Sequence, residues 1–352
     1  MRIYINGRFL TQRITGVQRY ALEITRALDS LISDEKNLQK HEYIVIAPKD
    51  VLYSIKLQNI LVVQKGVLKG HLWEQLELPI YSHDGFLINF CNCAPLFKKN
   101  QTVTIHDAAV SAVPHAFSLA FRTWYKLMFM WLGKSLKQIF TVSEFSKKEL
   151  HKYYGIPLNK IHVTYNGIDH IKIFKVDDGI IDREGLKDKK YILAVSSMNP
   201  SKNFALILDV AKLMPDVEFI IAGGSNAKVF QSAGLDVPQN AKFIGYVSDE
   251  ELMALYLHAS VFVYPSLYEG FGIPPLEAMM CGCPVVVSDI EIFHEVYGNS
   301  VKYCDCKDVR LWTKVLKEVI AHHSYSKIDL TKFCNKYNWK KNVYILRSII
   351  FS

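Results

Sequence analysis

The sequence predicts an α/β protein with two domains, each built around a parallel β-sheet. Short apolar segments typical of buried strands alternate with segments whose apolar residues recur at helical spacing, which is the pattern of βα units. The chain has 352 residues, 50% of them hydrophobic, which is enough for two separate cores. The periodicity is lost in the polar stretch 175–190, and we expect the interdomain linker just before it.

The first domain is expected to begin with a strand at residues 2–5 and a helix that opens at Gly16. Apolar residues of this helix recur every three or four positions from Val17 to Leu31. Further strands are expected at residues 43–47, 60–63, 86–90, 103–106, 139–142 and 161–165.

The second domain is expected to begin near residue 171 and to run to residue 336. A capping box, Ser248-Asp-Glu-Glu251, predicts a helix from Asp249, because its serine and glutamate can each bond the other's backbone N–H group. Strands are expected at residues 191–195, 217–222, 242–244, 261–264 and 284–287.

The charge of the chain favours anionic partners. The formal net charge is +8, which suits nucleoside diphosphates, anionic lipid surfaces or nucleic acid without choosing among them. No run of eighteen apolar residues occurs, and the N-terminus reads as a strand rather than a signal peptide. A cytoplasmic location is therefore expected.

Six of the seven cysteines form Cys-x-Cys pairs, at 91 and 93, 281 and 283, and 304 and 306. Structural zinc sites usually separate paired cysteines by two to four residues, and cytosolic thiols stay reduced. We expect these cysteines to be structural, with metal binding as the less favoured alternative.

The most informative stretch is residues 264–277, where Glu269 and Glu277 flank a glycine turn and a proline pair after an apolar strand. Pro274 and Pro275 can open a helix, whose free N–H groups suit an anion such as phosphate. A carboxylate is repelled by phosphate, so each glutamate is expected to face hydroxyl groups, one of a ribose and one of a sugar ring. The alternative, an acidic residue favoured at a helix start, accounts for Glu277 alone.

This stretch resembles the signature of glycosyltransferase family 4, retaining enzymes with the GT-B fold, in which two glutamates are separated by seven residues. The resemblance implies that Glu277 holds the ribose of the donor and Glu269 faces the transferred sugar. It places the amides of Phe271, Gly272 and Ile273 near the diphosphate.

The same resemblance implies two Rossmann-like domains with a cleft between them. Residues 1–170 would bind the acceptor and residues 171–336 the nucleotide sugar, and a helix at about 337–352 would cross back to the first domain. Asn166 and Gly167 look like the interdomain hinge, where glycine permits unusual backbone angles; an ordinary Asn-Gly turn is the alternative.

Lys202 lies at the start of a predicted helix, where a cation is unfavourable unless an anion is bound nearby. The resemblance implies that it binds the donor diphosphate; a solvated lysine is the alternative. Many family members add an arginine here, whereas this chain has Ser197 and Ser201. The phosphate site is then weaker or uses another cation.

His106 and Asp107 end the expected strand 103–106, at a sheet edge where ligands bind. A lone histidine is usually structural, but the resemblance implies that His106 contacts the transferred sugar and that Asp107 supports it.

Three further segments are donor-site candidates by resemblance. Gly16 belongs to a segment similar to the glycine-rich loop near the diphosphate, and Arg19 either supports an anion or is a solvated helix residue. Tyr246 and Val247 match a segment that contacts the nucleobase through its backbone.

The segment 117–132 is rich in aromatic residues and methionine and is followed by Lys134 and Lys137. It is either an amphipathic helix that meets an anionic membrane or a helix of the core.

The resemblance implies a retaining hexosyltransferase that uses a GDP-, UDP- or dTDP-linked sugar. Gly16–Arg19 and residues 196–203 are similar to bacterial members that build O-antigen or capsular polysaccharide, which implies a lipid-linked acceptor at the cytoplasmic face of the membrane and no nucleic-acid partner. No Asp-x-Asp motif is present, so no cofactor or metal is expected.

Two alternatives are a GT-B sugar-nucleotide epimerase or hydrolase and a non-catalytic nucleotide-sugar binding protein, the latter suggested by the missing arginine. A dehydrogenase is disfavoured because no Gly-x-Gly-x-x-Gly follows the first strand.

Overall fold

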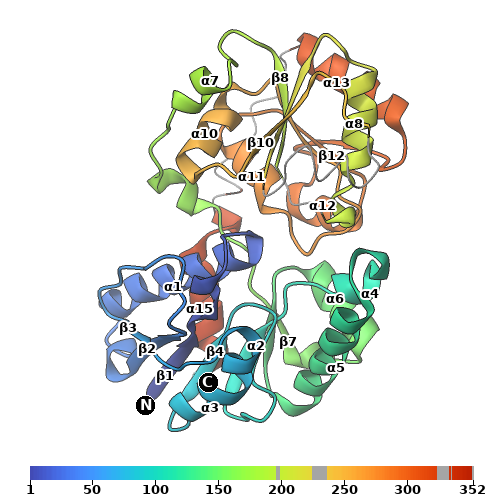
Figure 1. Ribbon diagram of the computed structural model, residues 1–352. Helices are drawn as coiled ribbons and strands as arrows, with labels where there is room; N and C mark the ends of the chain where they lie inside the picture. The colour runs from blue at the N-terminus through green and yellow to red at the C-terminus, as the bar shows by residue number, and fades with distance from the viewer. Residues whose placement is uncertain (196–198, 224–235, 323–332, 334, 351–352) are drawn as a thin grey trace. The chain divides into compact units, whose positions relative to one another are not determined.

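The computed structural model describes residues 1–195, 199–223, 236–322, 333 and 335–350. The chain divides into two compact units (Figure 1), each described here by itself. The first contains Met1–Gly167 and Tyr337–Ser352, and the second contains Ile168–Lys336.

The first unit is built on a seven-stranded sheet in the order β3-β2-β1-β4-β5-β6-β7, with every neighbouring pair parallel. The predicted strands are all present, with ends shifted by one or two residues. Their bounds are β1 Arg2–Asn6, β2 Glu42–Ala47, β3 Leu61–Gln64, β4 Phe86–Asn89, β5 Gln101–Thr104, β6 Ile139–Thr141 and β7 Ile161–Val163.

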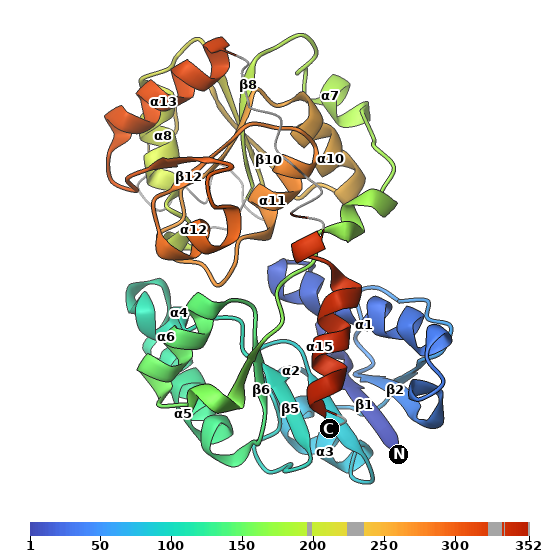
Figure 2. The ribbon, with the colours of Figure 1, turned by 180° about the vertical axis from the view of Figure 1, so that it is seen from behind.

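Helices cover both faces of this sheet (Figures 1 and 2). The longest are α1 Gly16–Asp34 and α5 Leu119–Ser135; the others are α2 Gly70–Leu72, η3 Trp73–Glu77, α3 Leu78–Tyr81, α4 Ala109–Ala112, α6 Glu144–Tyr154 and α15 Trp339–Ile350. Short 3₁₀ turns are η1 Gly7–Thr11, η2 Leu38–Lys40, η4 Pro114–Ala116 and η5 Leu158–Lys160.

The C-terminal helix α15 packs on α1 of the first unit, as the resemblance predicted (Figure 2). The rings of Tyr20 and Trp339 meet edge to face at 5.8 Å, and Lys340 Nζ lies 2.6 Å from an oxygen of Asp34. A Cβ on Gly167 would lie 2.5 Å from Cγ of Trp339. Glycine is required at this position because Trp339 packs closely against it. The sequence had suggested an unusual backbone angle as the reason instead.

The second unit is built on a six-stranded parallel sheet in the order β10-β9-β8-β11-β12-β13. Five strands were predicted, and β13 was missed because it has only three residues and begins with a lysine. The bounds are β8 Tyr191–Val195, β9 Glu218–Ala222, β10 Ala241–Gly245, β11 Val261–Tyr264, β12 Val285–Ser288 and β13 Lys302–Cys304.

The helical segments of this unit are η6 Asp169–Ile173, α7 Gly179–Arg183, η7 Pro200–Lys202, α8 Phe204–Lys212, α10 Asp249–His258, α11 Ile273–Met280, α12 Glu291–Tyr297 and α13 Val309–His322. The capping box is confirmed, since Ser248 and Glu251 each accept the other's backbone N–H at 3.2 and 2.9 Å. The polar stretch 175–190 is not structureless, because α7 buries Ile180 and Ile181.

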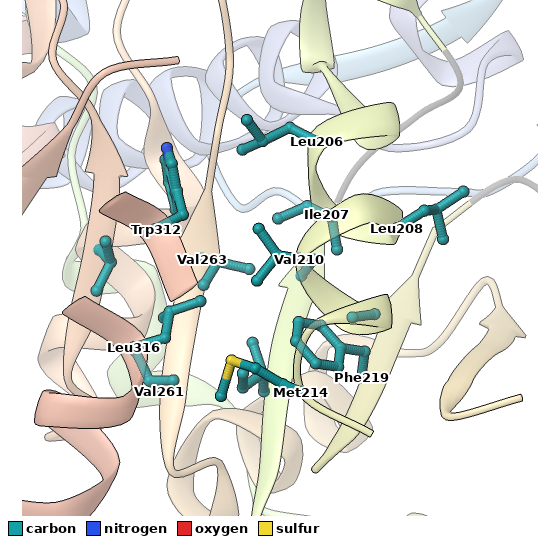
Figure 3. Close-up of a cluster of buried hydrophobic side chains, with 14 of the residues drawn as sticks. Leu206, Ile207, Leu208, Val210, Met214, Phe219, Val261, Val263, Trp312 and Leu316 are labelled. Atoms are coloured by element: carbon teal, nitrogen blue, oxygen red, sulfur yellow. The ribbon is translucent and has the colours of Figure 1, made fainter. Parts of the chain in front are cut away.

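A core between α8, α13 and one face of the sheet stabilises the second unit (Figure 3). Trp312 and Leu316 of α13 are fully buried and share this core with Val210 of α8 and Val261 and Val263 of β11. Apolar residues that recur at helical spacing in α8 and α13 form the helix faces that pack in this core.

The strand order of the second sheet reverses between β8 and β11, which are hydrogen-bonded neighbours. Ligands of open parallel sheets bind at the carboxyl ends of the strands beside such a reversal. The segments that follow β8 and β11 contain Lys202 and Glu269. The topology therefore places both residues at the edge where a ligand is expected.

Candidate active site

The turn between β11 and α11 depends on Gly272. This residue has φ +95°, and a Cβ there would collide with the hydroxyl of Tyr297. That hydroxyl donates to the Gly272 carbonyl at 2.6 Å. Pro274 and Pro275 occupy the first turn of α11, where the missing N–H groups cost no helix bonds. The predicted turn and helix start are both present.

Lys202 and Glu269 form an ion pair across the loops that follow β8 and β11. Lys202 Nζ lies 2.5 Å from Glu269 Oε1 and 3.4 Å from the hydroxyl of Tyr264. The N–H of Leu267 also donates to the carbonyl of Ser201 at 2.7 Å, so the two loops are joined through backbone and side chains.

Burial lowers the pKa of Lys202, but attraction to Glu269, aided by Tyr264, outweighs it and the pKa rises above its ordinary value. Lys202 thus remains an ammonium near neutral pH. The sequence had suggested that a bound phosphate accounts for a lysine at a helix start. The carboxylate of Glu269 compensates this charge instead, so a phosphate is not needed to account for Lys202.

Glu277 is held by two side chains that sequence reasoning missed. Its Oε1 lies 2.9 Å from Nε2 of His170, and its Oε2 accepts from the hydroxyl of Tyr256 at 3.2 Å. The Glu277 side chain is 12% exposed. No local signal marks either partner, since Tyr256 reads as a core position of α10 and His170 as a lone histidine after a turn.

The remaining predicted donor residues lie on other parts of the second unit. Tyr246 and Val247 follow β10, where Gly245 has φ +72°, and the Tyr246 side chain is exposed. Phe271 and Ile273 are buried on either side of Gly272. Ser197 lies outside the described residues.

His106 lies in the first unit, two residues beyond the end of β5, which is shorter than the strand 103–106 that the sequence predicts. The side chain is buried, its Nε2 lies 2.8 Å from the Phe90 carbonyl, and its ring meets the Tyr20 ring edge to face. Burial lowers the pKa of His106 to about 4. The imidazole is therefore neutral at pH 7, with its proton on Nε2, where the carbonyl accepts it. Asp107 accepts the N–H of Ala109 at 2.8 Å.

Gly16 is the first residue of α1, as predicted. Arg19 is buried, with Nη1 3.6 Å from Oε1 of Glu23. The interpretation of Arg19 as a solvated helix residue is therefore wrong.

A polar cluster in the first unit brings together His71, Glu74 and Cys93, whose possible ligand atoms all lie within 4.8 Å of one another. Glu74 is already paired with Arg8, whose Nε is 3.1 Å from Oε1. Burial raises the pKa of the Cys93 thiol well above its ordinary range. A guanidinium on the carboxylate and a protonated thiol both disfavour a metal ion, so we interpret the cluster as a buried polar network.

Helix α5 combines the two interpretations of segment 117–132. Met128, Phe129 and Leu132 are buried in the core, whereas other apolar side chains of the helix are exposed. Among the residues that the structure describes, no helix has the length and hydropathy needed to span a bilayer.

Two family models match the chain. Residues 73–172 match "Glycosyltransferase Family 4" and residues 177–328 match "Glycosyl transferases group 1". The resemblance drawn from the sequence is thereby confirmed.

Among curated proteins, the O-antigen chain mannosyltransferase RfbU of Salmonella typhimurium (strain LT2) is 34% identical over 226 residues, covering 63% of this chain and 61% of that protein. The O-antigen chain mannosyltransferase B of Escherichia coli is 28% identical over 341 residues, covering 88% of each.

Among solved structures, Anabaena Alr3699/HepE in complex with UDP-glucose has a TM-score of 0.71 at 15% identity, covering 99% of this chain and 98% of that one. The chain therefore belongs to the glycosyltransferases, with a family 4 domain followed by a group 1 domain and the two Rossmann-like sheets of the GT-B fold.

Proposed function

We propose that this glycosyltransferase moves a hexose, with retention of configuration, from a nucleoside-diphosphate sugar to a hydroxyl of a lipid-linked saccharide in bacterial surface polysaccharide synthesis. The two curated relatives described above are named as O-antigen chain mannosyltransferases, so mannose from GDP-mannose is the donor to test first. The observation that carries the proposal is the placement of Lys202 and Glu269 together at the β8–β11 edge of the second sheet.

In this proposal Glu277 binds the ribose and Glu269 a hydroxyl of the transferred sugar. Lys202 and the start of α11 lie beside the diphosphate, where a cation and a helix N-terminus favour an anion. Backbone groups of Phe271, Gly272 and Ile273 are proposed to line the phosphates, and Tyr246 and Val247 to border the base.

The reaction breaks the bond between C1 of the sugar and the diphosphate oxygen and forms a bond from C1 to the acceptor oxygen on the same face. The acceptor proton passes to the departing diphosphate. Negative charge grows on that leaving group, and Lys202 with the helix start stabilises it more in the transition state than in the ground state. No step calls for a metal, so transfer in excess EDTA is the expected result.

His106 is proposed to contact the transferred sugar. Because the imidazole is neutral and its one N–H, on Nε2, is given to the Phe90 carbonyl, its Nδ1 can accept a hydrogen bond from a sugar hydroxyl.

The direct test is sugar transfer from GDP-mannose, UDP-glucose and dTDP-rhamnose to lipid-linked saccharides extracted from a bacterial envelope. Glu269→Gln is expected to lower kcat by about 100-fold or more, as loss of a transition-state contact does. Glu318→Gln, an exposed change on α13, is the matched control and should retain full activity.

The products separate the alternatives. Free or epimerised sugar without transfer would indicate a hydrolase or epimerase, and donor binding without turnover would indicate a non-catalytic partner. Either result would contradict the proposed transfer.

A lipid-linked acceptor requires that the enzyme reach the membrane, and we propose that an apolar stripe of the first unit meets the cytoplasmic face. The stripe consists of Trp124, Leu127 and Trp131 on α5 and Phe97 in the loop before β5, with side chains 37%, 60%, 49% and 86% exposed. The Phe97 and Trp131 rings are 6.4 Å apart, so the loop and the helix form one surface. Exposed Lys126 and Lys134 flank it, which suits anionic headgroups.

A further inference from the structure

The contacts of Glu277 show how the proposed ribose-binding carboxylate is fixed in place. His170 on η6 and Tyr256 on α10 each contact a different carboxylate oxygen, at 2.9 and 3.2 Å. We propose that His170 and Tyr256 are positioning residues that present both oxygens of Glu277 to the vicinal hydroxyls of the donor ribose. This inference rests on the proposed function, in which Glu277 binds ribose.

Both contacts are donations to the carboxylate. An ionised carboxylate can only accept hydrogen bonds, so Nε2 of His170 carries a hydrogen. Burial raises the pKa of Tyr256 well above its ordinary value, so its hydroxyl keeps its proton and donates. Each carboxylate oxygen accepts about two hydrogen bonds. Each oxygen of the carboxylate is thereby tied to a different side chain.

The two donors are themselves held rigidly. His170 and Tyr256 are 2% and 1% exposed. The His170 ring packs edge to face on Phe174 at 6.2 Å, and the Tyr256 ring packs in the same way on Phe262 of β11 at 5.4 Å. This burial and ring packing hold both donors beside the carboxylate.

This rigidity matters because a glutamate side chain has three rotatable bonds. A free glutamate loses rotamer freedom when the nucleotide binds, whereas Glu277 loses it when the protein folds. The cost of ordering the carboxylate is thus removed from the binding step. A carboxylate that is already in position can distinguish a nucleotide with ribose hydroxyls from one that lacks them.

The alternative is that His170 and Tyr256 only satisfy a half-buried carboxylate. That role predicts lower stability in variants but no change in how the protein distinguishes ribose from deoxyribose. The two roles are separated by a double-mutant-type cycle, in which each protein variant is measured for its affinity to both the ribonucleotide and the deoxynucleotide.

The experiment measures the Kd of GDP, 2′-deoxy-GDP and 3′-deoxy-GDP by calorimetry, with UDP and its deoxy forms in parallel. Unmodified protein is expected to lose about tenfold in affinity when one ribose hydroxyl is removed, about 1.4 kcal/mol. In Tyr256→Phe and His170→Phe the loss should shrink below about threefold, because the misplaced carboxylate no longer recognises the hydroxyl.

Two variants serve as controls. His170→Gln keeps an N–H donor at the end of its side chain and should restore most of the discrimination. Tyr191→Phe removes another buried phenol bond, the 2.7 Å donation from Tyr191 to the Leu255 carbonyl beside Tyr256. Tyr191→Phe should leave the ratio of GDP to deoxy-GDP affinity unchanged. That result would show that disturbing α10 is not sufficient to abolish the recognition of ribose hydroxyls. In turnover, Tyr256→Phe should raise KM for the donor with kcat within about twofold.

The outcomes are distinguishable. If Tyr256→Phe and His170→Phe keep the unmodified ratio of GDP to deoxy-GDP affinity while Glu277→Gln loses it, the positioning role is wrong and the proposed function stands. If unmodified protein binds none of GDP, UDP and dTDP, the proposed function falls and this inference with it. If it binds dTDP alone, which has no 2′-hydroxyl, this inference is wrong and the proposed function stands. Should His170→Phe fail to fold, Tyr256→Phe decides, because it removes only one hydroxyl.

Discussion

At the scale of single residues, the side chains of the site combine charge with burial. Lys202 keeps its charge because Glu269 lies 2.5 Å away, and His106 loses its charge because it is buried. The proposed transfer uses both states, with a cation beside the diphosphate and a neutral hydrogen-bond acceptor for a sugar hydroxyl.

The depressed pKa of His106 predicts a pH-dependent stability. The folded value is about 4, below the unfolded value of about 6.5, so the unfolded chain binds more protons between these values. Stability is then lost as the pH falls from about 6.5 to about 4, by up to about 3 kcal/mol for this one group. Urea unfolding from pH 7 to 4.5 should show a steeper fall for unmodified protein than for His106→Gln. Parallel curves for the two proteins would contradict the buried neutral imidazole.

The sequence alone predicted some of the residues of the candidate site, but not all of them. Short sequence patterns predict a role for Glu269, Glu277 and Lys202. These patterns are a glycine turn, a helix start that contains prolines, and a cation before a helix. His170 and Tyr256 stand in no such pattern, because their role arises only when Glu277, 107 and 21 residues away, folds against them.

At the scale of elements, the proposed function depends on the turn into α11 and on the exposed side of α5. The two ends of α11 have glycines with positive φ, Gly272 at +95° and Gly282 at +76°, in different surroundings. They form a matched pair for mutation, because a Cβ at Gly272 meets Tyr297 whereas one at Gly282 has nothing within 4 Å.

Gly282→Ala is expected to cost on the order of 1 kcal/mol through backbone strain alone. Gly272→Ala should cost about 1–3 kcal/mol more, because a collision is added, and should weaken GDP or UDP binding by displacing the start of α11. Thermal unfolding and calorimetry measure the two effects. Tyr297→Phe in the Gly272→Ala background should recover part of the stability. Equal costs for the two alanine variants would refute the collision.

The apolar stripe predicts membrane binding that depends on two side chains in different elements. Leu127→Ser with Phe97→Ser should lower partitioning to vesicles of phosphatidylglycerol and phosphatidylcholine on the order of 100-fold, because two apolar side chains no longer leave water. Sedimentation with vesicles measures this. Leu257→Ser, an exposed leucine of the second unit that is 47% accessible, should bind as unmodified protein does. Unchanged binding of the double variant would rule out the stripe as the contact.

At the scale of the whole molecule, the two units have separate cores, which predicts separate responses to nucleotide. Leu316 of the second unit and Leu132 of the first are both fully buried, and either leucine to alanine should cost about 2–5 kcal/mol. In scanning calorimetry, GDP or UDP at about 100 times its Kd should add about 2.7 kcal/mol to one transition. Leu316→Ala should lower that transition and Leu132→Ala the other. A single transition lowered equally by both variants would show that the molecule unfolds as one unit.

The sequence by itself determined the two parallel sheets, the family and the segment of residues 264–277, because strand and helix periodicities, turn glycines and helix-opening prolines act over a few neighbouring residues. The tertiary structure alone decided which groups meet there. It paired Lys202 with Glu269 across 67 residues and brought His170 and Tyr256 to Glu277. Contacts of this range depend on how βα units pack side by side, and no local pattern encodes which loops become neighbours at the sheet edge.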